Sequence, residues 1–214
     1  MIDKLIEELS QKEVQLVAVS KTRSNEQIMQ CYEKGQRVFG ENRVKELVDK
    51  HKSLPKDIEW HMIGHLQSKK VKHIAGFINL IHSIDSIKLL HEVNKQAANQ
   101  NRKINVLLQL YIAKEKEKYG LDRETLEEII KAAKENQFPH IIITGLMGMA
   151  TFTSDKEQVK LEFAALKQTF DELKSRDAFD QNFKTLSMGM SGDYKEAIEI
   201  GSNMVRIGSL LLFQ

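Results

Sequence analysis

Lys21 is the residue whose type and position most readily suggest chemistry. It follows the apolar run from Val14 to Val19, so it would lie where a buried strand meets its connecting loop. Removing water from an ammonium group lowers its pKa, and a neutral amine can attack an aldehyde and hold it as a Schiff base. The alternative is that Lys21 is a solvated lysine just beyond a strand end. Its position relative to the strand, taken alone, favours this alternative.

Two glycine-rich segments near the C-terminus are suited to binding an anion. Residues 186–192 contain Ser187, and residues 206–209 contain Gly208 and Ser209. Glycines allow the backbone to approach a phosphate closely, and serine hydroxyls add hydrogen-bond donors. The alternative is that they are turn residues without a ligand. In a (β/α)8 barrel the last two loops commonly hold a phosphate, so a barrel context favours the phosphate site.

Arg206 is a charged residue inside the apolar run from Met204 to Ile207. A buried guanidinium needs a partner, because burial of an unpaired charge is costly. The partner is either an acidic side chain of the protein or an acceptor atom of a ligand. The residues themselves leave these two interpretations even.

Other candidates are weaker when taken one at a time. Asn42 either lines a site or caps the helix that would start at Arg43. His61 and His65 are four residues apart, but Gly64 and the strand-like residues around His61 argue against the helix that would align a zinc pair. We therefore expect no metal site, and we expect His61 to line the pocket.

The composition is that of an ordinary globular protein. The chain has 214 residues, of which 41% are hydrophobic and 29% charged, which suits one large domain over residues 1–214. A net charge of +2 gives no reason to expect nucleic acid or an acidic membrane as a partner. Cys31 is the single cysteine, and neither a signal sequence nor a membrane-spanning run is evident. We expect a cytoplasmic protein.

Short apolar runs alternate with helical patterns along the chain. The spacing predicts helices such as Ile87–Asn99, Thr125–Asn136 and Val159–Ser175. The predicted strands are Leu16–Val19, Arg37–Phe39, Glu59–Met62, Ile78–His82, Asn105–Ile112, His140–Gly145, Lys184–Ser187 and Asn203–Ile207. Continuous apolar strands are typical of a parallel sheet covered on both faces. The pattern predicts an α/β protein with a single (β/α)8 TIM-like barrel, and an open doubly wound sheet is the alternative.

The predicted strand ends bring distant residues to one rim. In parallel α/β proteins the ligand site forms at the C-terminal ends of the strands. The residues at or just beyond those ends are Lys21, Asn42, His61, Met147, Ser187 and Arg206. Near the C-terminus, Asp193 and Glu196 form a capping-box pattern, and Gly201 suits the left-handed end of that helix.

Taken together, these segments resemble the pyridoxal phosphate homeostasis protein family, also called the proline synthase co-transcribed homologue family. The resemblance rests on six ordered motifs that span nearly the whole chain: residues 18–22 (AVSKT), 39–42 (FGEN), 60–67 (WHMIGHLQ), 145–147 (GLM), 186–191 (LSMGMS) and 205–209 (VRIGS). It implies a single barrel related to the N-terminal domain of alanine racemase, with pyridoxal 5′-phosphate (PLP) as cofactor.

The resemblance also implies roles for individual residues. Lys21 matches the lysine that holds PLP as a Schiff base, and Ser187, Gly208 and Ser209 match phosphate-binding positions.

Three further positions match the family near the cofactor ring. Asn42 and Met147 match pocket positions, and Arg206 matches the arginine that faces the pyridine nitrogen. An arginine does not readily protonate that nitrogen, so the cofactor becomes a weaker electron sink.

The resemblance implies a protein of intracellular vitamin B6 homeostasis that carries or regulates PLP and has no established catalysis. Candidate recipients are PLP-dependent apo-enzymes, and we expect a monomer or weak dimer. The alternative is a PLP-dependent amino-acid racemase of weak or specialised activity, with Lys21 as a single base. Because the last predicted strand lies close to Gln214, we expect the second domain of alanine racemase to be absent. A phosphosugar-binding barrel with aldolase-like chemistry is a third interpretation, but no acid/base carboxylate is evident at the strand ends.

Overall fold

The apolar runs form parallel strands that close into a barrel, in a computed structural model that describes residues 2–115 and 119–209. Each strand pairs with its neighbour in the sequence, and the last pairs with the first. The strands are β1 (Gln15–Val19), β2 (Val38–Glu41), β3 (Glu59–Met62), β4 (Leu80–Ile84), β5 (Ile104–Gln109), β6 (Ile141–Met147), β7 (Thr185–Met190) and β8 (Met204–Ile207). The predicted (β/α)8 barrel is confirmed.

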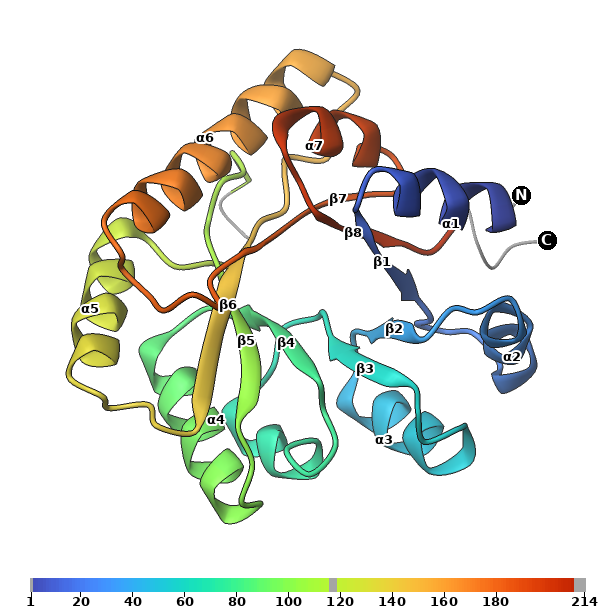
Figure 1. The fold of residues 1–214 in the computed structure, drawn as a ribbon, viewed down its shortest axis with the longest axis horizontal. Helices are drawn as coiled ribbons and strands as arrows, with labels where there is room; N and C mark the ends of the chain where they lie inside the picture. The colour runs from blue at the N-terminus through green and yellow to red at the C-terminus, as the bar shows by residue number, and fades with distance from the viewer. Residues whose placement is uncertain (1, 116–118, 210–214) are drawn as a thin grey trace.

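Helices surround the barrel and cover the outer face of its strands (Figure 1). They are α1 (Ile2–Gln11), α2 (Asn25–Glu33), α3 (Val44–Ser53), α4 (Ile87–Asn99), α5 (Arg123–Lys134), α6 (Lys156–Ser175), α7 (Tyr194–Ile200) and the 3-10 helix η1 (Ser68–His73). This cover explains why the strands are apolar on both faces.

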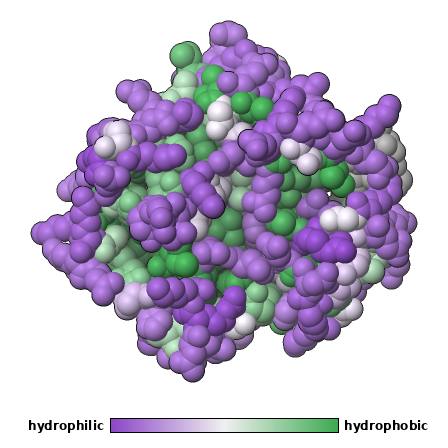
Figure 2. Space-filling model, in the orientation of Figure 1, coloured by the Kyte–Doolittle hydropathy of each residue, from purple (hydrophilic) through white to green (hydrophobic). Residues whose placement is uncertain are grey.

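Apolar side chains pack in two regions, as the alternation of side chains along a strand requires. Ala18 belongs to the large core between strands and helices, whereas Val17 faces the barrel interior. The inner cluster comprises Val17, Val38, Leu80, Leu107, Met147 and Met204. On the face seen in Figure 2, hydrophilic residues cover most of the surface, with hydrophobic residues between them.

Several strands run further toward their C-terminal ends than the pattern predicts. Strand β6 continues two residues beyond Gly145, and β7 continues through Gly189 to Met190. Glycine weakens a strand pattern, so the prediction stopped at or before these residues. Both glycines have positive φ angles, and the β7–β8 register shifts between Ser187 and Met190. Ser187 therefore lies inside β7 rather than at its end.

The predicted capping box before α7 is wrong. Asp193 occupies the N-cap, but its side chain makes no capping hydrogen bond. Its carboxylate instead accepts a hydrogen bond from the backbone N–H of Met190 at 2.6 Å. Gly201 ends the helix in the left-handed region, as predicted.

Within residues 2–115 and 119–209, no helix is both long enough and apolar enough to span a membrane. In the same ranges, no cluster of three or more His, Cys, Asp or Glu side chains is arranged to hold a metal ion. Cys31 is a buried free thiol, and burial raises its pKa.

Candidate functional site

Lys21 lies at the C-terminal end of β1, two residues beyond Val19. Its side chain is exposed, so the water-depleted surroundings considered from the sequence are not what the structure shows. The loop after β8 lies against the same strand end, because a Cβ atom on Gly208 would lie 3.1 Å from the Cβ and carbonyl oxygen of Val19. The structure thus brings the two ends of the barrel sequence, Lys21 and Gly208, to one part of the rim.

Asn42 lies half-buried in the loop after β2 and contacts the loop after β3. A Cβ atom on Gly64 would lie 2.6 Å from the carbonyl oxygen of Asn42, and Ser83 donates a hydrogen bond to the Gly64 carbonyl at 2.6 Å. Arg43 is the N-cap of α3 and has no side-chain cap. The helix-capping alternative for Asn42 is therefore wrong, because the helix starts one residue later than predicted.

Arg206 points into the barrel and is held by neutral acceptors. It is 4% exposed, and its Nη1 donates to the hydroxyl of Ser187 at 2.7 Å and to the Ser187 carbonyl at 3.0 Å. Its Nη2 donates to the carbonyl of Gly148 at 3.2 Å. Burial lowers the pKa of Arg206 to about 10, an effect that the charge of Asp193 opposes. No carboxylate forms an ion pair with Arg206 in the described part of the chain. The structural ion pair considered from the sequence is therefore not present there, and the acceptors that hold the guanidinium are neutral.

Two buried histidines extend this network through the barrel. His82 Nδ1 lies 3.3 Å from Ser187 Oγ, and His82 Nε2 lies 3.0 Å from His61 Nδ1. Arg206 can only donate, so Ser187 Oγ accepts from it; the buried Ser187 proton then needs His82 Nδ1 as its acceptor. This direction places the proton of each histidine on Nε2. His82 was missed at the sequence level, because nothing in the pattern marks a strand histidine as inward-facing.

His61 lines a hollow, but at the opposite mouth of the barrel. This polar hollow of about 300 Å³ includes residues at the N-terminal ends of the strands, such as Gln15, Glu59 and Asn105. The expectation that His61 lines the strand-end pocket is therefore wrong. His65 is exposed and lies 2.8 Å from Asp85, so it forms no pair with His61.

Stability is expected to fall in acid because of the two buried histidines. Burial lowers the pKa of His61 to about 3 and that of His82 well below its usual value of 6.5. Below about pH 6.5 the unfolded chain binds protons that the folded chain excludes, so the free energy of unfolding decreases as the pH falls. From about pH 7 to about pH 5 the expected loss is roughly 2 kcal/mol for His61, and the lowered pKa of His82 adds to the loss in the same direction.

Urea unfolding at both pH values checks this prediction. His61→Gln should clearly reduce the loss of stability between the two pH values, whereas replacement of the exposed His73 by glutamine should leave it unchanged. An equal pH dependence in the wild-type chain and His61→Gln would contradict it.

The loops after β7 and β8 meet through Ser191, which the sequence pattern did not mark as a site residue. The backbone N–H of Gly208 donates to Ser191 Oγ at 3.3 Å. On the other side of the β7 loop, Lys156 donates to the carbonyl of Gly192 at 3.0 Å. Ser209 is exposed next to Gly208. The donors on this part of the rim are hydroxyl and backbone N–H groups, which suit an anion.

The comparisons with known proteins agree on one family. A profile of the family described as "Alanine racemase, N-terminal domain" matches residues 2–214. A pyridoxal phosphate homeostasis protein of Aquifex aeolicus is 39% identical over 197 residues, which cover 92% of this chain and 85% of that protein. The protein of the same name from Homo sapiens is 35% identical over 206 residues, covering 92% and 74%. This chain belongs to the pyridoxal phosphate homeostasis protein family.

Solved structures extend the family comparison. PipY of Synechococcus elongatus PCC7942, without PLP, superimposes with a TM-score of 0.89 at 31% identity, covering 99% of this chain and all of that one. The same protein with PLP bound gives a TM-score of 0.87 at 30% identity. An alanine racemase from Bartonella henselae shares the fold, with a TM-score of 0.73 and 18% identity, and this chain covers 57% of it.

The positions expected from the family resemblance fall into two groups. Lys21, Asn42, Gly208 and Ser209 lie in rim loops, whereas Met147, Ser187 and Arg206 lie in strands whose side chains enter the barrel. Met147 ends β6 beside Ser187 of β7 and is fully buried. Their roles toward a cofactor stay predictions.

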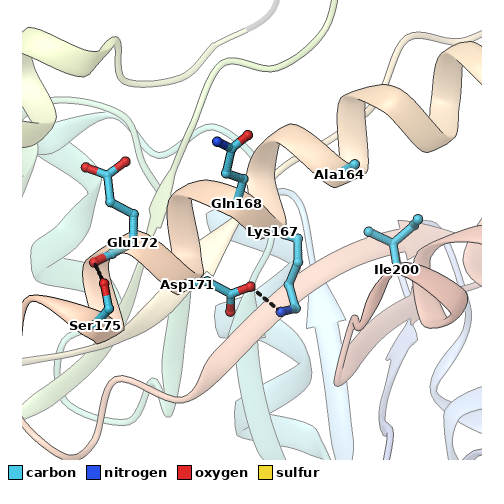
Figure 3. A pocket seen from close by; sticks show the side chains of 7 residues that line it. All are labelled: Ala164, Lys167, Gln168, Asp171, Glu172, Ser175 and Ile200. Carbon is cyan, nitrogen blue, oxygen red and sulfur yellow. Dashed lines mark hydrogen bonds and ion pairs between the residues drawn. The ribbon is translucent and has the colours of Figure 1, made fainter.

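A groove beside helix α6 is separate from these residues. It lies on the outer side of the barrel, lined by α6 side chains and by Ile200 at the end of α7 (Figure 3). Lys167 and Asp171, one turn apart on α6, form an ion pair at 2.5 Å beside the groove. Because these two charges satisfy each other at the surface, the groove offers little to a polar ligand.

Proposed function

We propose that this chain binds pyridoxal 5′-phosphate through a Schiff base on Lys21. The observation that carries the proposal is the exposed amine of Lys21 at the same part of the rim as the loop after β8. PipY, which is similar in sequence and fold, has been solved with PLP bound. The amine of Lys21 would form a C=N bond with the aldehyde carbon, and the carbonyl oxygen would leave as water.

We propose that the loops after β7 and β8 hold the phosphate. Ser209 is exposed there with its hydroxyl group. Ser191 Oγ accepts from the N–H of Gly208 and can still donate its own proton, and the absence of a side chain on Gly208 lets the phosphate approach closely. Ser187 was also expected to bind phosphate. Its hydroxyl is fully buried and already bonded to Arg206 and His82, so we assign it to the support of Arg206.

We propose that the protein carries or regulates PLP and does not turn over a substrate. PLP acts as an electron sink when its pyridine nitrogen is protonated. With a pKa of about 10, Arg206 stays charged at neutral pH and donates hydrogen bonds without readily giving up a proton. This favours storage of the aldehyde over carbanion chemistry, with Asn42 and Met147 as neighbours of the ring.

A Schiff base is reversible, which suits a carrier. An incoming amine can form its own C=N bond with the aldehyde carbon and release Lys21 as the free amine. We propose PLP-dependent apo-enzymes as recipients, in the cytoplasm, with the protein acting as a monomer or weak dimer.

The test mixes the purified chain with PLP and follows the visible absorbance of the protein-bound cofactor. Reduction with borohydride, proteolysis and mass spectrometry should then place one pyridoxyl phosphate group on the peptide that contains Lys21. A chain that develops no such absorbance, or carries the group on other lysines at equal levels, would disprove the proposal.

The racemase alternative rests on the same exposed amine, which could act as a single base. It predicts exchange of the α-proton of alanine with solvent deuterium by the PLP-loaded protein. We expect exchange no faster than with free PLP and an unrelated carrier protein. Sustained turnover would support the racemase instead.

A further inference from the structure

Helix α3 contacts the backbone on both sides of Lys21. The ammonium group of Lys50 donates to the carbonyl oxygen of Ser20 at 2.8 Å. The backbone N–H of Thr22 donates to Glu46 Oε2 at 3.1 Å. The first contact holds the peptide unit before Lys21 and the second holds the one after it. Two side chains of one helix therefore restrain both peptide units of this residue.

Lys50 is part of a buried network rather than a surface contact. Its Nζ lies 2.6 Å from Glu41 Oε1, which also accepts from Ser20 Oγ at 2.6 Å. Lys50 is 7% exposed and Glu41 is fully buried. The second carboxylate oxygen of Glu41 is buried without a hydrogen-bond partner among the described residues. Burial raises the pKa of Glu41, while its hydrogen bonds to Lys50 and Ser20 oppose the rise.

Such a network is poorly explained by stability alone. Burying an ion pair costs desolvation on both partners, and apolar residues of similar volume often stabilise as well or better. The unpartnered oxygen of Glu41 adds to that cost. A role in fixing local geometry is therefore the better explanation, and the geometry fixed is that of the turn at Ser20.

Thr22 shows that this turn is strained. Its φ angle is +62°, in the left-handed region that β-branched residues rarely adopt. Its hydroxyl donates to the carbonyl of Lys21 at 2.6 Å, and the N–H of Arg23 donates to the Ser20 carbonyl at 3.0 Å. Strained conformations persist where the surroundings over-determine them, and they cluster at functional sites.

We propose that Lys50, Glu41 and Glu46 form a clamp on helix α3 and strand β2 that positions Lys21 for reaction with the aldehyde. These three are positioning residues, since they act through the backbone of Ser20 and Thr22. The assignment rests on the proposed function, because Lys21 is the reacting amine only there. The clamp restrains where the backbone projects the Lys21 side chain, so its loss should slow attachment more than it weakens the fold.

The test compares full-length variants in the rate at which PLP becomes attached to Lys21. Lys50→Met removes the donor, and Glu46→Ala removes the acceptor of the Thr22 N–H. Each is expected to slow attachment about tenfold or more, because displacement by a fraction of an ångström disfavours the reactive geometry. Lys50→Arg and Glu46→Gln retain the donor and the acceptor, so both should recover most of the rate.

Lys45 provides the matched control, since it lies exposed on the same helix. Lys45→Met should attach PLP at the wild-type rate. The free energy of unfolding of every variant is measured in urea. The clamp is supported only if PLP attachment slows in a variant that is folded and the conservative variant restores the rate. Wild-type rates in folded Lys50→Met and Glu46→Ala would overturn the proposal. If Lys50→Met does not fold, the Glu46→Ala and Glu46→Gln variants still test the proposal, because Glu46 is only half-buried.

A second measurement separates the clamp from the proposed function. Amide hydrogen exchange at Thr22 should become about tenfold faster in Glu46→Ala than in Glu46→Gln, whether or not PLP binds. If PLP fails to attach even to the wild-type chain, the proposed function is wrong, and the exchange result alone shows whether the restraint exists. Unchanged exchange at Thr22 would overturn the clamp.

Discussion

Replacement of Lys21 by alanine is expected to abolish covalent attachment of PLP. The visible absorbance of the bound cofactor should be lost, and borohydride should fix no pyridoxyl phosphate group to the chain. The reason is chemical: alanine has no amine to condense with the aldehyde. Because the Lys21 side chain is exposed, the free energy of unfolding should change by less than about 0.5 kcal/mol.

Non-covalent binding should survive in Lys21→Ala, because the rim donors near Gly208 and Ser209 remain. We expect an affinity about a hundredfold lower, or roughly 3 kcal/mol, measured by calorimetry with PLP. Pyridoxal without the phosphate should then bind more weakly still. Lys72→Ala, at an exposed position on η1, serves as the control and should keep the full absorbance. Persistent borohydride labelling of Lys21→Ala at wild-type levels would contradict the assignment.

Replacement of Gly145 by alanine is expected to have the largest effect on stability. Strand β6 passes so close to β7 that a Cβ atom at this position would lie 1.7 Å from the carbonyl oxygen of Thr185. Gly145 also has a φ angle of +158°, which strains any residue with a side chain. The strands must separate, so we expect a loss of about 3 kcal/mol or more in the free energy of unfolding.

The effect of Gly145→Ala should reach the site as well. Strand β6 leads to Gly148, whose carbonyl accepts a hydrogen bond from Arg206. Urea unfolding at neutral pH checks the stability. Gly76→Ala is the control, because the nearest atom to its new Cβ is the mobile end of Gln100 at 3.3 Å. It should change stability by less than about 0.5 kcal/mol, and an equally small effect of Gly145→Ala would show that β6 can shift without cost.

Most of the fold could be predicted because each strand and helix is encoded locally. Periodicity and apolar runs located every strand, although β6 and β7 extend past Gly145 and Ser187, and β5 ends at Gln109 rather than at the predicted Ile112. Closure could not be predicted, since the pairing of β1 with β8 joins residues such as Leu16 and Val205 that local patterns do not connect. The resemblance of the six ordered motifs to a known family indicated a closed barrel, which periodicity alone could not distinguish from an open sheet.

The site was only partly predictable from its residues. Lys21 and Gly208 follow strand ends, and strand order alone brings such ends to one rim. Ser187 is different: its side chain enters the barrel because of where it falls in β7, and side-chain direction reverses with every residue. His82 was missed for the same reason, and Lys50 because a lysine in a helix is normally solvated.

The sequence by itself therefore determined the order of the elements, the alternation of strands and helices that indicates a parallel α/β protein, and the residues that follow the strand ends. These depend on spacing along the chain, which local propensity and periodicity report. The tertiary structure alone decided which polar side chains are buried together. The hydrogen-bonded network from Arg206 to His61 and the clamp around Lys21 both join residues distant in sequence. Only the closed barrel, and the packing of α3 against β2 and against the turn after β1, bring them within hydrogen-bonding distance.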